Sequence, residues 1–242
     1  MSCEDEHYHN HNHNHNHNHG DEDHGHDHIA PIPTNTSQSL NSKIDTFKVT
    51  ALNLQNPNDD LSKLFKDSNN EYEIKPIIKS DCDSQLIINI PFLNGSVKLY
   101  SIIIRSNGDL HCPRVIKLFK NDKTIDFDNV EIKKPVQILQ HPKIGVQCDD
   151  EDELPTILES DNEFVEHFVS RHKFTGVQTL TIFIESIHDD DEDEVWLHSV
   201  ELRGEFTELN KDPIITLYES AANPQDHKNL TAIEENNNIA FE

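Results

Sequence analysis

The residues with the clearest capacity for chemistry are the histidines near the start of the chain. Histidine occupies every second position from His7 to His19, asparagine fills most of the gaps, and His24, His26 and His28 follow. In an extended chain alternate side chains point to one side, so these imidazoles could form a row. Imidazole is a ligand for Zn²⁺, Cu²⁺ and Ni²⁺, but a selective site also needs fixed geometry and supporting hydrogen bonds, which a polar repeat does not supply. We therefore interpret the tract as a repeat expansion with adventitious metal binding and no dedicated metal site.

The cysteines are the next candidates for catalysis or metal binding. There are four of them, at positions 3, 82, 112 and 148, and their spacing includes neither a C-x-x-C pair nor a zinc-finger pattern. Cys112 follows His111 in the sequence. Neighbouring side chains on a strand point to opposite faces, however, so this adjacency does not make a pair of nucleophile and base. We expect the thiols to be reduced and none of them to be catalytic.

Motifs for other catalytic chemistry are absent from the sequence. It contains no G-x-S-x-G turn, no P-loop, no G-x-G-x-x-G dinucleotide motif and no H-E-x-x-H zinc motif. With 7 glycines in 242 residues, the chain has little material for loops that cradle phosphate. The sequence therefore predicts a protein that is not an enzyme and that uses no cofactor.

A short polar segment, residues 80–84, could contact a cation or a partner. Within it, Asp81 and Asp83 could supply carboxylates to a cation. The alternative, which we favour, is a loop whose Asp and Ser side chains cap their own backbone, because these residues are ordinary turn formers. Asp81 and Asp83 are therefore kept as candidate partner contacts and not as metal ligands.

A second segment, Arg203-Gly204-Glu205, lies at the end of a predicted strand. It indicates either an Arg–Glu pair with a glycine that allows a bend or close approach, or a site where Arg203 anchors a carboxylate of a partner. Both interpretations stay open, and they make Arg203 and Glu205 candidate partner contacts. The single tryptophan, Trp196, lies in the same strand. We expect it to pack in the core, with an exposed hot spot for a partner as the alternative.

The net charge of −25 excludes some classes of partner. Acidic residues gather in two runs, at 149–153 and 189–194, and the chain as a whole offers no basic surface of the kind that nucleic acid or an anionic membrane requires. The runs are most simply solvated loops, with a contact to a basic partner or weakly bound Ca²⁺ as the alternatives. The sequence shows no signal-peptide pattern and no stretch of the roughly 18 apolar residues that a membrane helix needs. We expect a soluble monomer in the cytoplasm and nucleus.

The elements that position these residues are predicted to be strands. Short runs rich in Ile, Val, Phe and Thr alternate with turn residues, and no long stretch has the apolar spacing of a helix. Asn94-Gly95 predicts a hairpin between two such runs, and residues 40–45 and 59–65 could each form a helical turn. This regular spacing favours an all-β jelly-roll sandwich over an α/β fold. The strands are expected at residues 85–92, 97–105, 115–120, 136–140, 164–172, 177–185 and 195–205.

Composition divides the chain into three parts. Residues 1–39 are predicted to be a disordered tail and linker, because they cannot bury enough apolar surface to offset the entropy lost on ordering. Residues 40–219 are expected to form the domain, and residues 220–242 a polar C-terminal extension. On this division, deleting residues 1–39 should leave the thermal transition nearly unchanged.

Several segments, in order along the chain, resemble the PITH (proteasome-interacting thioredoxin-like) domain family. They are residues 80–83, 85–92, 97–102, 115–121, 126–128, 177–180 and 202–205, together with Phe174. Cys82 stands where the family usually has alanine. The His-rich start and residues 218–227 resemble the branch of the family in which the domain stands alone, without a thioredoxin domain and its C-x-x-C motif.

The resemblance implies a jelly-roll sandwich, similar to galactose-binding-like domains, and an association with the 26S proteasome. The expected function is therefore a non-enzymatic protein–protein interaction module, bound to the proteasome or a related complex. The alternative is a β-sandwich that binds a small ligand, a carbohydrate or Ca²⁺, in its loops. A carbohydrate site would need an exposed aromatic platform, so an exposed Trp196 would favour that alternative.

Overall fold

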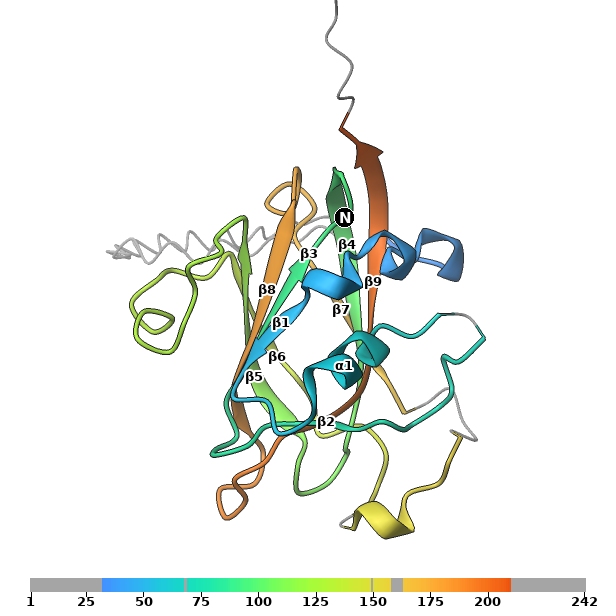
Figure 1. Ribbon diagram of the computed structural model, residues 1–242, viewed down its shortest axis with the longest axis vertical. Helices are drawn as coiled ribbons and strands as arrows, with labels where there is room; N and C mark the ends of the chain where they lie inside the picture. Colours follow the sequence, from blue (N-terminus) through green and yellow to red (C-terminus); the bar gives the residue numbers. More distant parts are fainter. Residues whose placement is uncertain (1–31, 68, 149, 158–162, 210–242) are drawn as a thin grey trace, which may run out of the picture. The chain divides into compact units, whose positions relative to one another are not determined.

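The fold is a sandwich of two antiparallel sheets (Figure 1). The computed structural model describes residues 32–67, 69–148, 150–157 and 163–209. The 5-stranded sheet has the order β1-β3-β8-β5-β6, and the 4-stranded sheet has the order β2-β9-β4-β7. The predicted all-β sandwich is therefore confirmed. The predicted histidine tract and C-terminal extension lie outside the described residues.

Each predicted strand overlaps an observed one, and the strands that the sequence did not predict, β1 and β2, are short. The strands are β1 (Thr50–Leu52), β2 (Ile78–Lys79), β3 (Leu86–Pro91), β4 (Gly95–Ser106), β5 (Pro113–Lys120), β6 (Gln137–Gln140), β7 (Val165–Phe168), β8 (Thr179–Ile187) and β9 (Trp196–Glu208). The helical segments are the helix α1 (Asn58–Leu61) and the 3₁₀ turns η1 (Thr36–Gln38), η2 (Asn41–Lys43), η3 (Thr46–Lys48), η4 (Ser62–Leu64) and η5 (Glu151–Glu153). None of these helices in the described part of the chain is long and apolar enough to cross a membrane.

The core lies between the sheets and takes alternate residues from each strand. It includes Leu86, Ile88 and Ile90 of β3, and Leu180, Ile182 and Ile184 of β8. The intervening residues Ile87 and Phe183 join a second buried cluster with Phe119, Ile125 and Val130. Because side chains alternate along a strand, this second cluster lies on the outer face of the five-stranded sheet. Strands β3 and β8 are apolar on both faces because the loop after β5 covers this outer face.

The predicted hairpin at Asn94-Gly95 is wrong. The chain does reverse there, and Asn94 has a positive φ of 35°. However, β3 pairs with β1 and β8, while β4 pairs with β7 and β9, so the connection crosses from one sheet to the other. An Asn-Gly turn predicts that the chain reverses direction. It does not determine which strands pair, because pairing depends on contacts between distant segments. Gly95 is needed for close packing, since a Cβ there would collide with the Phe206 ring and lie 2.7 Å from the Thr207 carbonyl oxygen.

The ordered segment that packs on the sheet extends back to Thr34, before the predicted boundary at Leu40. The Asn35 side chain caps η1 by accepting a hydrogen bond from the Ser37 backbone N–H at 3.1 Å. Ser39 forms an isolated antiparallel bridge with Arg203 of β9. The polar composition of this segment predicts a disordered linker. It is ordered instead because hydrogen bonds, and not apolar burial, hold it to the sheet.

Candidate interaction surfaces

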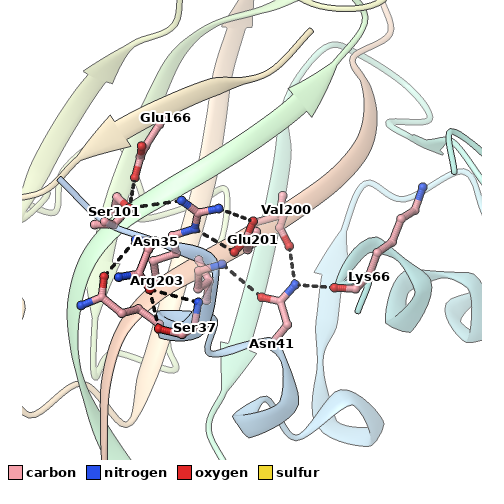
Figure 2. Close-up of polar contacts among 12 residues, drawn as sticks. Asn35, Ser37, Asn41, Lys66, Ser101, Glu166, Val200, Glu201 and Arg203 are labelled. Atoms are coloured by element: carbon pink, nitrogen blue, oxygen red, sulfur yellow. Dashed lines mark hydrogen bonds and ion pairs between the residues drawn. The ribbon is translucent and has the colours of Figure 1, made fainter. Parts of the chain in front are cut away.

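Arg203, the predicted anchor for a partner, is bound within the fold (Figure 2). Its Nε and Nη2 atoms donate to the two carboxylate oxygens of Glu201, at 2.8 and 3.3 Å. Its Nη1 atom donates to Thr34 Oγ1 at 3.3 Å. Glu201 and Arg203 are alternate residues of β9 and so share one face of the sheet, and each side chain is 13% exposed. The expected Arg–Glu pair is present, but the partner is Glu201 and not Glu205.

Glu166 of β7 completes this network. Its Oε1 atom accepts hydrogen bonds from Ser101 Oγ, at 2.6 Å, and from Thr34 Oγ1. Ser101 and Arg203 are cross-strand partners, and their neighbours Ile102 and Leu202 point into the core. The network therefore lies on the outer face of the four-stranded sheet, where it holds Thr34 in place.

Asn41 is a residue whose role the sequence does not indicate. It is buried, and its Nδ2 atom donates to the carbonyl oxygens of Lys66, at 2.9 Å, and Val200, at 3.1 Å (Figure 2). Its Oδ1 atom accepts from the Leu202 backbone N–H at 3.1 Å. The side chain thus takes the place of a neighbouring strand along β9, beyond the point where β2 ends. No local signal separates this asparagine from the others, because its partners are distant in the sequence.

Glu205 is exposed at the far end of β9, opposite Lys98 of β4. Gly204 beside it faces a bulge in β4, and a Cβ at Gly204 would collide with the Lys98 carbonyl oxygen. The glycine therefore allows a close approach of two strands, which is one of the two roles expected for this segment. Glu205 is accessible to a partner, whereas the donors of Arg203 are used within the fold.

Asp81 and Asp83 lie in an exposed loop that Asn53 organises. Asn53 Nδ2 donates to Asp83 Oδ1, at 2.9 Å, and to the Gln85 carbonyl, at 2.7 Å, and its Oδ1 accepts from the Cys82 backbone N–H at 3.0 Å. Asp83 Oδ1 also accepts from the Gln85 backbone N–H at 2.9 Å. This is the self-capping turn that the sequence favours over a cation site.

Residues of both acidic runs lie at the same end of the sandwich as this loop, Asp190 because it belongs to the β8–β9 connection that also holds Glu194. We call this surface the acidic end; it is made of Asp81, Asp83, Glu151, Asp190 and Glu194. Lys79 of β2 makes an ion pair of 2.6 Å with Glu151. The Ser80 backbone N–H donates to the Val195 carbonyl at 3.3 Å, next to Glu194. These contacts bring residues from three separate loops to one end of the sandwich.

The four predicted contact residues do not form one site. Strand β2, which leads into Asp81, pairs with β9 at Trp196 and Leu197, whereas Glu205 lies toward the other end of β9. At roughly 3.3 Å per residue, the stretch from Trp196 to Glu205 spans about 30 Å. Asp81 and Asp83 therefore belong to one surface, and Glu205 to another.

Trp196 is buried beside the acidic end, so the predicted core role is confirmed. The residue is 4% exposed, and its ring stacks on that of His111, with centroids 4.0 Å apart and an interplanar angle of 11°. Lys79 Nζ lies 4.3 Å from the ring centroid, and the indole Nε1 donates to Glu194 Oε2 at 3.1 Å. Because a carbohydrate platform needs an exposed ring, Trp196 gives no support to the small-ligand alternative.

A buried row of polar side chains has the order of a catalytic relay. Ser106 Oγ lies 3.4 Å from His141 Nε2, and His141 Nδ1 lies 2.8 Å from His167 Nε2. Burial lowers the pKa of His141 to about 3 and that of His167 to about 4. Ser106 is 0% exposed and His141 is 2% exposed, so a substrate has no access to the hydroxyl. No motif in the sequence indicates this row, because its residues come from three distant segments.

The thiols of Cys82 and Cys112 are held in the protonated form. A hydrogen bond to Asp81 raises the pKa of Cys82, and burial raises the pKa of Cys112 to about 11. Neither is a thiolate nucleophile at neutral pH. Across the ranges that the structure describes, no three His, Cys, Asp or Glu side chains gather as a metal site.

Comparison of the sequence with known proteins gives one family. The family model described as the PITH domain matches residues 30–222. The PITH domain-containing protein P35G2.02 of Schizosaccharomyces pombe is 29% identical, with 84% of this chain and 90% of the relative covered. PITH domain-containing protein 1 of Danio rerio is 31% identical (82% and 85% covered), and that of Homo sapiens is 32% identical (68% and 69% covered).

Comparison of the structure with solved structures gives distant similarities. The family 32 carbohydrate-binding module from Streptococcus pneumoniae EndoD has a TM-score of 0.42 at 7% identity, over 65% of this chain and 97% of that one. CBM32-3 from a family 31 glycoside hydrolase of Clostridium perfringens has a TM-score of 0.40 at 10% identity, over 72% and 99% of the two chains. At this distance the similarity carries no argument about what the present chain binds.

Proposed function

The chain belongs to the PITH domain family, and from this membership we propose that it is a non-enzymatic protein–protein interaction module that associates with the 26S proteasome or a related complex. The match over residues 30–222 is the observation that carries the proposal, because the family is named for its interaction with the proteasome. The chain also covers 90% of the Schizosaccharomyces pombe relative, which agrees with the stand-alone branch of the family. Such a partner implies that the protein works in the cytoplasm and nucleus, as a monomer before it binds.

The chemistry of the described residues supports binding over catalysis. Ser106 and His141 are closed to substrate, and the thiols of Cys82 and Cys112 stay protonated at neutral pH. An interaction module needs no reactive group and only a stable surface of defined shape. The two-sheet core supplies the stability, and the loops at its ends supply the surface.

The acidic end is the contact surface that this proposal favours, with Asp81 and Asp83 at its centre. Asp81, Asp83 and Asp190 are exposed, and part of the surface is held in place because Asn53 organises the loop of Asp81 and Asp83 and because Lys79 pairs with Glu151. Fixed carboxylates suit a partner with a basic surface, since complementary charge speeds encounter and selects among partners. On this view Glu205 lies outside the contact surface and serves as the control position, and Arg203 contributes by holding residues 34–39.

Affinity purification tests the proposed function. The tagged full chain is expressed at its endogenous level and captured at low and at moderate salt, and the co-purifying proteins are quantified by mass spectrometry. We expect proteasome subunits in stoichiometric amounts at both salt concentrations. If the protein elutes alone, this member of the family does not associate with the proteasome.

Charge-neutralising variants test the surface separately from the function. Asp81→Asn/Asp190→Asn removes two charges at the acidic end, and Glu205→Gln/Glu208→Gln removes two charges at the other end of β9. We expect the first variant to capture severalfold less proteasome and the second to capture as much as the unmodified chain. Equal capture by both variants would keep the function and reject the acidic end as its surface.

A further inference from the structure

Arg105 of β4 is a largely buried cation that donates no hydrogen bond to the described residues. It is 7% exposed, and its guanidinium carbon lies 5.1 Å from the ring centroid of Phe164 and 6.0 Å from that of Tyr72. Among the described residues, no carboxylate or carbonyl oxygen accepts a hydrogen bond from it. Buried guanidinium groups are normally paired, because an ion away from water is costly without a partner. The hydrogen-bonding fork of Arg105 is therefore available to a ligand.

Ser199 lies beside Arg105 on the adjacent strand. The two residues are cross-strand partners of β4 and β9, so their side chains share one face of the sheet. Ser199 is 3% exposed, and its Oγ atom has no hydrogen-bond partner within the described residues. Buried hydroxyl groups without a partner are uncommon in native proteins and call for an explanation. The Arg105 guanidinium and the Ser199 hydroxyl thus lie side by side, and both can donate hydrogen bonds to a ligand.

Both residues line one small pocket on the outer face of the four-stranded sheet. Its interior volume is about 20 Å³, slightly more than the roughly 10–15 Å³ that one water-sized group needs. Lys66 lines the same pocket, and its Nζ atom donates to the Glu73 carbonyl. Burial lowers the pKa of Lys66 to about 8, so the side chain remains mainly protonated at neutral pH. Guanidinium, ammonium and hydroxyl groups therefore line one small volume, together with acidic side chains.

Acidic residues at the same pocket limit the charge of its ligand. Asp67, Glu71 and Glu201 line it, but the Glu201 carboxylate is bound to Arg203. The Glu71 carboxylate makes no hydrogen bond or ion pair within the part of the chain that the structure describes. Asp67 and Glu71 balance the charges of Arg105 and Lys66, and they repel a doubly charged anion more strongly than a singly charged one.

We propose that Arg105, Ser199 and Lys66 form a binding pocket for a single carboxylate group, with the Arg105 guanidinium as its anchor. The planar fork of a guanidinium matches the two oxygens of a carboxylate. Ser199 can donate to one of those oxygens from the same face of the sheet. The small interior receives the end of a ligand, either a small organic acid or an acidic side chain of a protein. This pocket is separate from the acidic end, so it does not depend on the proposed function.

Titration of the ¹⁵N-labelled full chain with sodium acetate tests the proposal, with sodium chloride as the control for ionic strength. We expect acetate to shift the Arg105 Nε–H resonance and the amide resonances of Ser199 and Val200, and we expect these shifts to saturate. Arg105→Met should weaken acetate binding about tenfold or more, because a hydrogen bond to a charged group is lost. Ser199→Ala should weaken it severalfold, and Arg105→Lys should retain part of it. Identical shifts with chloride, or no saturation, would overturn the proposal.

Three further measurements give the proposal other ways to fail. Without acetate, Arg105→Met should unfold at the same temperature as the unmodified chain or higher, since no internal hydrogen bond or ion pair is lost and methionine can still pack on the rings of Phe164 and Tyr72. If Arg105→Met and Glu71→Gln instead destabilise the chain equally, Arg105 and Glu71 form an internal pair and the pocket is not a ligand site. Tighter binding of inorganic phosphate than of acetate would reject the carboxylate assignment. A blocked tripeptide with one central glutamate distinguishes the sources, because tighter binding than acetate would indicate a protein ligand and equal or weaker binding a small acid.

Discussion

The Nδ1 atom of His141 lies 2.8 Å from the Nε2 atom of His167, and this hydrogen bond joins the two sheets at one edge. His141 follows β6, the last strand of the five-stranded sheet, and His167 lies in β7, the last strand of the four-stranded sheet. A hydrogen bond between two imidazoles needs one nitrogen that donates and one that accepts, so at least one ring must be neutral. Acidification therefore removes a contact between the sheets.

The free energy of unfolding should fall as the pH drops below about 6.5. Burial lowers the pKa values of His141, His167 and His198 from 6.5 to about 3, 4 and 3. Between these limits the unfolded chain binds more protons than the folded chain, so each histidine removes up to about 1.4 kcal/mol of stability per pH unit. Urea unfolding at pH 7.5, 6 and 5 measures the slope. His141→Gln should flatten it, and His172→Gln, at an exposed position, should not. An unchanged slope in His141→Gln would contradict this assignment.

Deleting residues 1–39 should lower the melting temperature more than deleting residues 1–33. The longer deletion removes Thr34, which hydrogen-bonds to Arg203 and Glu166, and Ser39, which bridges to β9. A loss of a few hydrogen bonds corresponds to about 1–3 kcal/mol. Thermal unfolding followed by circular dichroism compares the two truncations. Equal melting temperatures would mean that residues 34–39 contribute nothing, as their composition alone predicts.

Replacing Arg203 with methionine should destabilise the domain by about 3 kcal/mol, near the low end for breaking a buried ion pair. The cause is the Glu201 carboxylate, which is 13% exposed and would lose its bidentate partner. The double variant Arg203→Met/Glu201→Met should recover most of the loss, because it leaves no unpaired charge. Chemical unfolding of the single and double variants gives the coupling energy. A double variant as unstable as the single one would assign the loss to Thr34 and not to Glu201.

Gly95→Ala should cost about 1–3 kcal/mol, as expected when extra volume enters a packed position. The added methyl group would collide with the ring of Phe206. Phe206→Leu in the same chain should restore part of the stability by making room, and Phe206→Leu alone provides the reference for this cycle. Additive effects of the two substitutions would show that Phe206 is not the obstacle.

The strands and the core could be predicted from the sequence because burial imposes a simple period. Residues 85–92 and 177–185 are nearly continuously apolar or alternate between apolar and polar, which is the pattern of a strand covered on one or both faces. They form β3 and β8. The pairing of strands could not be predicted, since the turn at Asn94-Gly95 is compatible with a hairpin and with a crossing between sheets. Strands β1 and β2 were missed because segments of 3 and 2 residues show no period.

The surfaces were less predictable than the fold. Glu201 and Glu205 lie equally far from Arg203 on the same face of β9, so the pattern alone does not choose between them. The turn at Asp83 could be predicted because an Asx turn is local. The contacts of Asn41, and the meeting of Arg105 with Ser199, depend on strand register between distant segments, which no local pattern encodes.

The strands at the outer edges of the sandwich are its short ones. β2 has 2 residues, β1 has 3, and β6 and β7 have 4 each, whereas the inner strands β4 and β9 have 12 and 13. A short edge exposes few unpaired backbone amides, so it is a poor template for a strand from another chain. A peptide that binds by adding a strand to a sheet would therefore find few backbone groups to pair with. Short edge strands also disfavour edge-to-edge polymerisation. A partner protein would therefore bind this protein through side chains and not by strand pairing.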